Sequence, residues 1–371
     1  MADFLELMSD ESWRGYGSIR NPHKSDVWKK QLSEVNRLLE NRQGRSTRAW
    51  AAKLEEAMST DTFTYLFADI LDRKLEAAFQ GVGTPLAPVF RKATLRDFRA
   101  RKIQKITGQT QRLQKVNELG EYTAQEVADS EVEYSLEKYG RIMQWSWESF
   151  INDDIGLIDS FPQTLANNAI NTLAYLQTSL LFDADGPIDA NMTGDGGLAA
   201  IATTALSIAN LQAAITAMQG YTDNDEPILN KPKYLVVGPI LEMTARTILS
   251  DAALQVTTTA NVPVSTFNAL SQYRLELIVD PWLPLLATNN VSSWALVAAP
   301  EFCVGCEFGE LAGHVGPELF VKAPTQSPVG GGGGSPMDGG FETDAAAYKV
   351  RLVAGGTGSI EHRAFWGSQC T

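Results

Sequence analysis

The sequence predicts an α+β fold that is divided into several units. Apolar residues recur at helical spacing over the N-terminal part and again after Ser160, whereas between residues 132 and 147 they alternate with polar residues, as in a strand. Between residues 199 and 300, helix and strand patterns follow one another, which predicts an α/β unit within the larger fold. The chain has 371 residues, of which 44% are hydrophobic, so it can form two or three compact units with a sizeable core.

The N-terminal part is predicted to be a helical arm. Three short amphipathic helices are expected, with apolar faces at Trp28, Leu32, Val35 and Leu39, at Trp50, Leu54 and Met58, and at Phe63, Phe67, Ile70, Leu71, Leu75 and Phe79. Gly81 is expected to end the third helix. Because polar links separate the helices, we expect an arm whose apolar faces need a neighbouring molecule to cover them.

Charge is unevenly distributed along the chain, although the net charge of −13 argues against tight nucleic-acid binding. Residues 20–53 contain nine Lys or Arg against three acids, and residues 85–115 contain nine against one. Residues 121–154 reverse the sign, with nine acids against two bases. These segments can be solvated faces, or they can pair within a subunit or between subunits. The candidates for contacts between subunits are Arg91, Lys92, Arg96, Arg99, Arg101, Lys102, Lys105, Glu131 and Glu133, together with Phe63, Phe67 and Ile70.

The segment after Pro85 and Pro88 contains few large apolar residues among its bases, so we expect an extended excursion without a core of its own. The following strand pattern at Val132, Tyr134 and Leu136 changes parity before Met143, Trp145 and Trp147, which predicts one extra residue near Gly140. Trp145 and Trp147 could stack on bases, but their alternation favours a place in a core or an interface.

The clearest helix of the sequence is expected to begin at Ser160 and Pro162 and to run for about 23 residues. Its predicted apolar face consists of Leu165, Ala169, Leu173, Leu176 and Leu180. The expected elements after it are a helix through Ile208, Leu211, Ile215 and Met218, a strand at 234–237, a helix that begins at Gly238 and Pro239, strands at 275–279 and 294–298, a strand through Tyr348, Val350 and Leu352, and a short strand at 364–366.

No residue pattern indicates an active site. His23, His314 and His362 lie beside no plausible nucleophile, and the sequence has no Gly-x-Ser-x-Gly motif. We therefore predict a protein that is not an enzyme and has no cofactor; a hydrolase with an unrecognised site is the alternative from another class. No apolar run is long enough to span a membrane, and the acidic N-terminus predicts no secretory signal.

Two further motifs have a structural and a chemical interpretation. Cys303 and Cys306 form a single CxxC, which could bind zinc with Cys370 and His314 or act in redox chemistry, but a buried pair of small hydrophobic residues is favoured. The glycine run at 330–334 lacks the Lys-Ser/Thr of a phosphate-binding loop, so a flexible loop is expected. Residues 152–154 could bind a divalent cation, but an acidic start of the long helix is the simpler interpretation.

Several short motifs resemble those of tailed-bacteriophage major capsid proteins of the Mu-type major head subunit group. They are Arg96-Asp97-Phe98-Arg99, the stretch from Asn117 to Tyr122, the stretch from Ser146 to Asp154 with the sequence SWESFINDD, and Phe161-Pro162. The ending, with a strand at 348–353 and a short strand through Ala364, is also similar. The long helical N-terminal part and the glycine run depart from the group, and no lysine–asparagine–glutamate set matches the cross-linking residues known in one branch of the fold.

This resemblance implies the Hong Kong ninety-seven-type shell fold. The implied parts are an N-terminal arm (1–84), an extended loop (85–140), a peripheral domain with a long spine helix (141–198), an axial domain (199–341) and C-terminal strands that complete both domains (342–371). The implied function is a major capsid protein that self-assembles into pentamers and hexamers of an icosahedral or prolate shell enclosing double-stranded DNA. An encapsulin-type nanocompartment shell is the alternative within the same fold.

The resemblance also implies partners. They are other copies of the chain, packaged double-stranded DNA bound without sequence specificity, portal and scaffold proteins, and decoration proteins, with no membrane partner. The expected location is the virion capsid, after assembly in the host cytoplasm.

Overall fold

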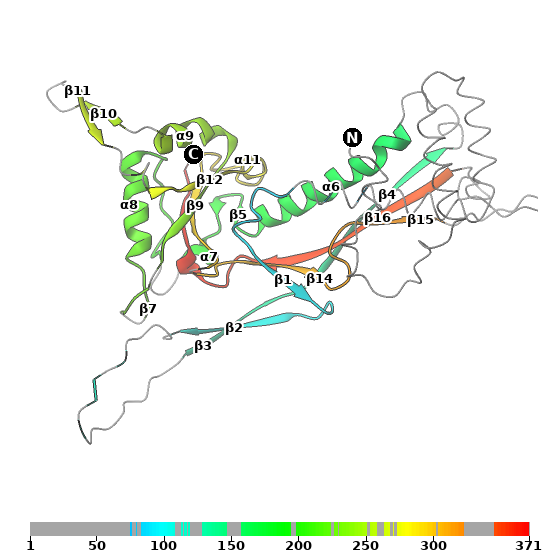
Figure 1. Cartoon of the computed structure of the whole chain (residues 1–371), viewed down its shortest axis with the longest axis horizontal. Coiled ribbons are helices and arrows are strands. Elements are labelled where there is room, and N and C mark those ends of the chain that lie inside the picture. Colours follow the sequence, from blue (N-terminus) through cyan, green and yellow to red (C-terminus); the bar gives the residue numbers. More distant parts are fainter. Residues whose placement is uncertain are drawn as a thin grey trace, which may run out of the picture. The chain divides into compact units, whose positions relative to one another are not determined.

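A computed structural model (Figure 1) describes residues 75, 79, 83–107, 113, 115–116, 118, 128–146, 157–193, 198–223, 226–228, 230–250, 253–257, 263–267, 270, 273–301, 303–322 and 345–370. The predictions for Phe63, Phe67 and Ile70, for residues 152–154 and for the glycine run lie outside these residues. The chain divides into two compact units. The larger unit comprises residues 79–139, 167–312 and 353–371, and the smaller one comprises 1–78, 140–166 and 313–352.

The larger unit contains a four-stranded sheet in the order β12-β9-β13-β17. Its strands are β9 (Pro232–Val237), β12 (Glu276–Val279), β13 (Trp294–Ala298) and β17 (Phe365–Ser368). Strand β9 pairs parallel with β12 and antiparallel with β13, whose other edge pairs with β17. Leu235, Trp294 and Phe365 are fully buried, because these strands lie in the core and are apolar along nearly their whole length. The strands predicted at 234–237, 275–279 and 294–298 are thus confirmed, and β17 extends the strand predicted at 364–366.

The helices of this unit follow local sequence signals. Helix α8 (Ile208–Gln219) begins after Ser207, whose side chain accepts a hydrogen bond from the backbone N–H of Asn210 at 3.2 Å. It buries Leu211, Ala214, Ile215 and Met218, which confirms most of the predicted face. The 3₁₀ turn η3 (Pro239–Leu241) leads into α9 (Glu242–Ser250), as Gly238 and Pro239 predict.

The long helix α6 (Leu157–Ser179) begins three residues before the predicted start at Ser160. The buried stripe consists of Leu165, Ala166, Ala169, Ile170, Leu173, Ala174, Gln177 and Thr178. The apolar face predicted through Leu176 and Leu180 is therefore wrong at its C-terminal end, where both residues are only half-buried. The polar Gln177 and Thr178 are buried instead, because hydrogen-bonding partners from distant segments satisfy them.

The basic segment is more structured than the sequence predicts. Strand β1 (Arg91–Leu95) pairs parallel with β14 (Glu307–Leu311), and β2 (Arg101–Thr107) pairs antiparallel with β3 (Ala128–Tyr134). Leu95 of this segment lies in a small core that it shares with residues of other segments, which agrees with the expectation that the segment has no core of its own. That core consists of Leu95, Tyr134, Leu136, Leu311 and Val353, with Ala93 and Ile103 packed against it.

Strand β4 (Glu137–Ser146) follows β3, and the break between them falls at Ser135 and Leu136, earlier in the chain than the expected irregularity near Gly140. Strand β4 pairs with β16 (Ala345–Thr357). A Cβ atom at Gly140 would lie 2.7 Å from the carbonyl oxygen of Val350, so glycine permits this close approach of the two backbones. In β16, Tyr348, Val350 and Leu352 are buried, as the alternating pattern predicts.

Strand β16 also pairs with β14 in the larger unit and with β15 (Glu318–Val321) in the smaller unit. The remaining elements are β5 (Phe182–Asp183), β6 (Gly186–Pro187), α7 (Asp189–Met192), β7 (Thr222–Asp223), β8 (Glu226–Pro227), β10 (Ala253–Thr257), β11 (Pro263–Phe267), α11 (Leu283–Leu286) and η5 (His362–Ala364). The hairpin of β10 and β11 was not predicted.

Candidate intersubunit surfaces

A buried carboxylate, Glu307, binds two of the basic candidate residues within the same chain. Arg91 donates to Glu307 Oε2 from Nε at 2.8 Å, and Arg101 Nε lies 3.1 Å from Oε1. The hydroxyl group of Tyr134 donates to Oε1 at 2.7 Å. Burial and the hydrogen bond to Glu307 raise the pKa of Tyr134, so the phenol remains a donor. This site joins strands β1, β2, β3 and β14.

The β2–β3 hairpin brings together three more of the candidate residues. Lys102 contacts Glu131 and lies 2.9 Å from Glu133. Hydrogen bonds to these acids raise the pKa of Lys102, and the one from Lys102 lowers the pKa of Glu133. Since all three side chains are exposed, the ion pairs contribute little to stability. The basic and acidic segments thus pair within the chain at this hairpin. Pairing within a subunit was one of the arrangements that the sequence allowed.

The other basic candidates of this segment are solvent-accessible. Lys92, Arg96 and Arg99 are exposed, and Arg99 lies 3.8 Å from the exposed Asp97. The side chain of Lys105 lies outside what the structure describes. The exposed residues are thus free to meet another molecule, whereas Arg91 and Arg101 are held by Glu307.

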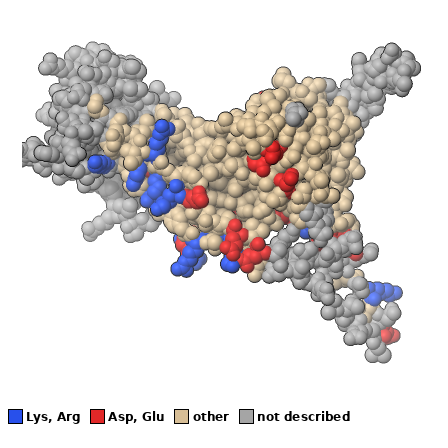
Figure 2. All heavy atoms as spheres, turned by 180° about the vertical axis from the view of Figure 1, so that it is seen from behind, with Lys and Arg blue, Asp and Glu red and all other residues tan. Residues whose placement is uncertain are grey.

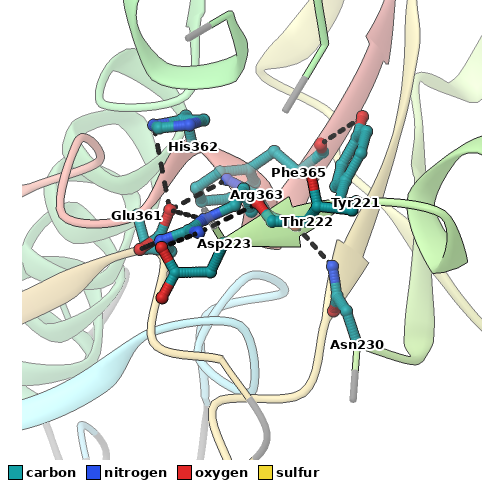
Figure 3. A network of polar contacts seen from close by, with 8 residues as sticks. All are labelled: Tyr221, Thr222, Asp223, Asn230, Glu361, His362, Arg363 and Phe365. Carbon is teal, nitrogen blue, oxygen red and sulfur yellow. Dashed lines mark hydrogen bonds and ion pairs between the residues drawn. The ribbon is translucent and has the colours of Figure 1, made fainter. Parts of the chain in front are cut away.

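A second buried ionic network, which the sequence analysis did not identify, fixes the C-terminal segment (Figure 3). Arg363 pairs with Glu361 at 2.8 Å and with Asp223 at 2.9 Å, and it donates to the carbonyl of Thr222 at 3.1 Å. Although burial disfavours its charge, the hydrogen bonds to Glu361 and Asp223 raise the pKa of Arg363. The network connects η5 to strand β7, more than a hundred residues earlier in the chain. No local sequence pattern predicts this network, because Asp223 and Arg363 are far apart in the sequence.

The same network holds the next strand. The amide of Asn230 donates to the carbonyl of Arg363, and the hydroxyl of Tyr221 donates to the carbonyl of Phe365 at 3.3 Å. Figure 3 shows both side chains directed towards the segment that contains η5 and β17. Buried polar groups of this kind are costly unless paired, so their pairing fixes where β17 joins the sheet.

The two cysteines of the CxxC motif differ in burial, so the prediction of a buried pair holds for Cys306 alone. Cys306 is buried and its thiol donates to the carbonyl of Val89 at 3.3 Å, whereas Cys303 is half-buried. Burial raises the pKa of the Cys306 thiol, which makes it a poor nucleophile. Within the described ranges, no group of three His, Cys, Asp or Glu side chains could hold a metal ion. Among the residues that the structure describes, no helix is long and apolar enough to cross a membrane.

Several large apolar side chains are exposed to solvent. On the larger unit, Ile240, Met243 and Leu285 are exposed on η3, α9 and α11. On the face seen in Figure 2, most of the described surface carries neither acids nor bases, and the charged side chains gather in small groups. Single exposed apolar side chains are normal at a protein surface, so these three residues do not by themselves mark a binding site.

Comparisons with known proteins bear on both the fold and the family. The sequence model of a family described as phage capsid protein matches residues 129–367. None of the curated protein sequences matches the chain. The chain is similar to the capsid structure of the cyanophage P-SCSP1u, with 9% identity, a TM-score of 0.51 and coverage of 78% of this chain and 88% of that chain. This similarity shows a shared shell fold.

Two other solved structures are similar at lower TM-scores. A chain of Gordonia phage Cozz has 13% identity and a TM-score of 0.46, with 78% of this chain and 87% of that chain covered. A chain of the holo-SrpI encapsulin complex from Synechococcus elongatus has 12% identity and a TM-score of 0.45, with 76% and 86% covered.

Proposed function

The chain belongs to the phage capsid protein family, and from this membership we propose that it assembles into pentamers and hexamers that close into a shell around double-stranded DNA. The family model spans well over half of the chain, and this single observation carries the proposal. The protein is a structural major capsid protein of the virion with the Hong Kong ninety-seven-type shell fold. The family match favours a phage shell over an encapsulin-type compartment and over a hydrolase.

The finer assignment within the family rests on the sequence motifs. The stretches at 96–99, 117–122 and 146–154 support a place in the Mu-type group. They also support the division into an arm (1–84), an extended loop (85–140), a peripheral domain (141–198), an axial domain (199–341) and C-terminal strands (342–371). Portal, scaffold and decoration proteins are further proposed partners.

The contacts between subunits are proposed to involve the exposed basic residues of the extended loop and the apolar face of the arm. Lys92, Arg96 and Arg99 are exposed and can reach acids of a neighbouring copy. Arg91, Arg101 and Lys102 have acids of their own chain as partners, with Glu131 and Glu133 bound to Lys102. Lys105, Phe63, Phe67 and Ile70 complete the proposed set from the sequence pattern alone. Each contact can be modest, because many repeated contacts stabilise a closed shell.

Electron microscopy of the expressed full-length chain tests the proposal. We expect shells, or rings of five and six subunits, in which the exposed Lys92, Arg96 and Arg99 contact acids of an adjacent copy. A homogeneous monomer at concentrations above those typical of capsid assembly would contradict the proposed assembly. Assembled particles in which residues 91–115 contact only their own copy would leave the assembly standing and reject the role of this segment.

A further inference from the structure

Strands β15 and β16, which pair at one edge of a larger sheet, have an outward face in the smaller unit that is basic. In the antiparallel register, Glu318 lies opposite Arg351 and Phe320 lies opposite Lys349. Lys322 donates its backbone N–H to the carbonyl of Ala347, which continues the same register. Directly opposed residues of an antiparallel pair share one face, and every second residue along a strand does so too. Glu318, Phe320, Lys322, Lys349 and Arg351 therefore lie on one face.

The opposite face of β16 is buried. Tyr348, Val350 and Leu352 alternate with the residues of the outward face and are at most 8% exposed. The ladder thus has one side in the core of its unit and one side in solvent. Lys322, Lys349 and Phe320 are exposed, and Val315, which precedes β15 in the chain, is 42% exposed.

The residues that β15 and β16 place on this outward face include three bases and one acid, in a chain whose net charge is −13. The single acid, Glu318, is paired with Arg351, which donates from Nε at 3.0 Å, and it also contacts His314. Burial opposes the charge of Glu318, but the hydrogen bonds from His314 and Arg351 lower its pKa. In the described part of the chain, neither Lys322 nor Lys349 has a carboxylate partner.

An exposed aromatic ring lies among these cations. The Nζ of Lys349 is 4.8 Å from the centre of the Phe320 ring, and the guanidinium of Arg351 is 4.6 Å from it. The interactions hold both cations on the outward face, next to the ring. Figure 2 shows Lys and Arg side chains gathered at the left of the view.

A protein partner fits this face better than a nucleic acid does. DNA phosphates could pair with the bases but would leave the apolar Phe320 and Val315 uncovered. An acidic protein surface can pair with the two free lysines and bury both apolar side chains. A second copy of the chain, with its large excess of acids, offers such a surface.

We propose that the outward face of β15 and β16 is an interface that receives exposed carboxylates of a second copy of this chain. The inference rests on the proposed assembly and adds the surface through which two copies meet. Because the basic face and the acidic surface belong to different parts of the chain, the contact is heterologous, and repeating it around an axis closes a ring.

A combined charge-reversal and cross-linking experiment on assembled particles tests this interface. Lys322→Glu with Lys349→Glu places acids opposite acids, so the yield of particles should fall by about tenfold or more. The control is Lys231→Glu, since Lys231 is also exposed and also lies over an aromatic ring, 5.4 Å from the centre of Tyr273, in the larger unit. The control variant should assemble with a yield close to that of the unchanged chain.

Cross-linking of the unchanged chain keeps the test independent of how the variants fold. Particles assembled from a mixture of nitrogen-14 and nitrogen-15 chains are treated with a carbodiimide, which joins amines to carboxylates in direct contact. Peptides that join Lys322 or Lys349 to an acid of the other isotope support the interface. Links confined to one copy, or normal particles of the double variant, would overturn it. Normal particles of the double variant that hold less DNA would assign the face to DNA instead. Failure of the unchanged chain to assemble would reject the proposed function itself.

Discussion

Glu307 and Arg363 are charged side chains without solvent exposure or nearly so, and each has partners from distant segments. Arg91 is 216 positions away from Glu307, and Tyr134 is 173 positions away. A buried charge contributes to stability only while its partners remain, because removal of one partner leaves the others desolvated and unpaired. Glu307 and Arg363 are therefore single residues on which the positions of strands β1, β2 and β3 and of the C-terminal segment depend.

Replacement of Glu307 by glutamine should destabilise the subunit by about 2 kcal/mol. This loss of stability is smaller than the loss expected when a fully buried ion pair is broken, because Arg91 and Arg101 remain partly solvated. Chemical denaturation of the soluble subunit measures the change. The matched control is Glu276→Gln, which removes an exposed acid 3.7 Å from Lys233 and should change the free energy of unfolding by less than about 0.5 kcal/mol. Equal effects of the two changes would contradict the role of Glu307.

At the scale of elements, strand β16 brings neighbouring backbones very close. At Gly355, a Cβ atom would lie 2.4 Å from the carbonyl oxygen of Ser135 and 3.1 Å from the Cα of Leu136. Ser135 and Leu136 form the link between β3 and β4, so a glycine in β16 determines how closely this link can pack. The neighbouring atoms are backbone atoms, which cannot turn aside as a long side chain can.

The change Gly355→Ala should therefore lower the stability of the subunit by about 1–3 kcal/mol and lower its melting temperature. Gly83→Ala is the control, because no atom lies within 4 Å of a Cβ at that position. It should be neutral or slightly stabilising, since alanine restricts the unfolded chain. Differential scanning calorimetry of both variants gives the comparison, and an unchanged melting temperature for Gly355→Ala would show that the link can move away.

At the scale of the whole molecule, the N-terminal segment remains a prediction of the sequence, since residues 1–58 lie outside those that the structure describes. Its apolar stripes are strong, and burial of each large apolar side chain contributes about 1.5–3 kcal/mol. A short amphipathic helix is only marginally stable in water when it is isolated. Both arguments predict that the arm is ordered by neighbouring subunits in the shell.

Deletion of residues 1–58 should leave a soluble, folded subunit that forms capsomers poorly or yields shells with a lower melting temperature. Light scattering during heating of purified particles measures this loss. Deletion of residues 1–19, which precede the first helical pattern, should have a much smaller effect. Shells of normal yield and unchanged melting temperature after the longer deletion would show that the arm is dispensable.

By itself, the sequence determined the elements whose signals are local. The spacing of Leu211, Ile215 and Met218 predicted α8, and the apolar run of Tyr234–Val237 predicted a strand, because helices and strands repeat over a few residues. The alternation of Tyr348, Val350 and Leu352 likewise predicted which face of β16 is buried. The motifs around residues 146–154 predicted a capsid protein, and the family match confirms it.

Only the tertiary structure decided which distant residues meet. The sequence left open whether the basic and acidic segments pair within a subunit, and it did not reveal that Glu307 binds Arg91 and Arg101. It also predicted the wrong end of the α6 face, because the burial of Thr178 depends on Asp280, which accepts its hydrogen bond at 2.6 Å. Such pairings depend on contacts between segments far apart in the chain, and no periodicity within one segment contains that information.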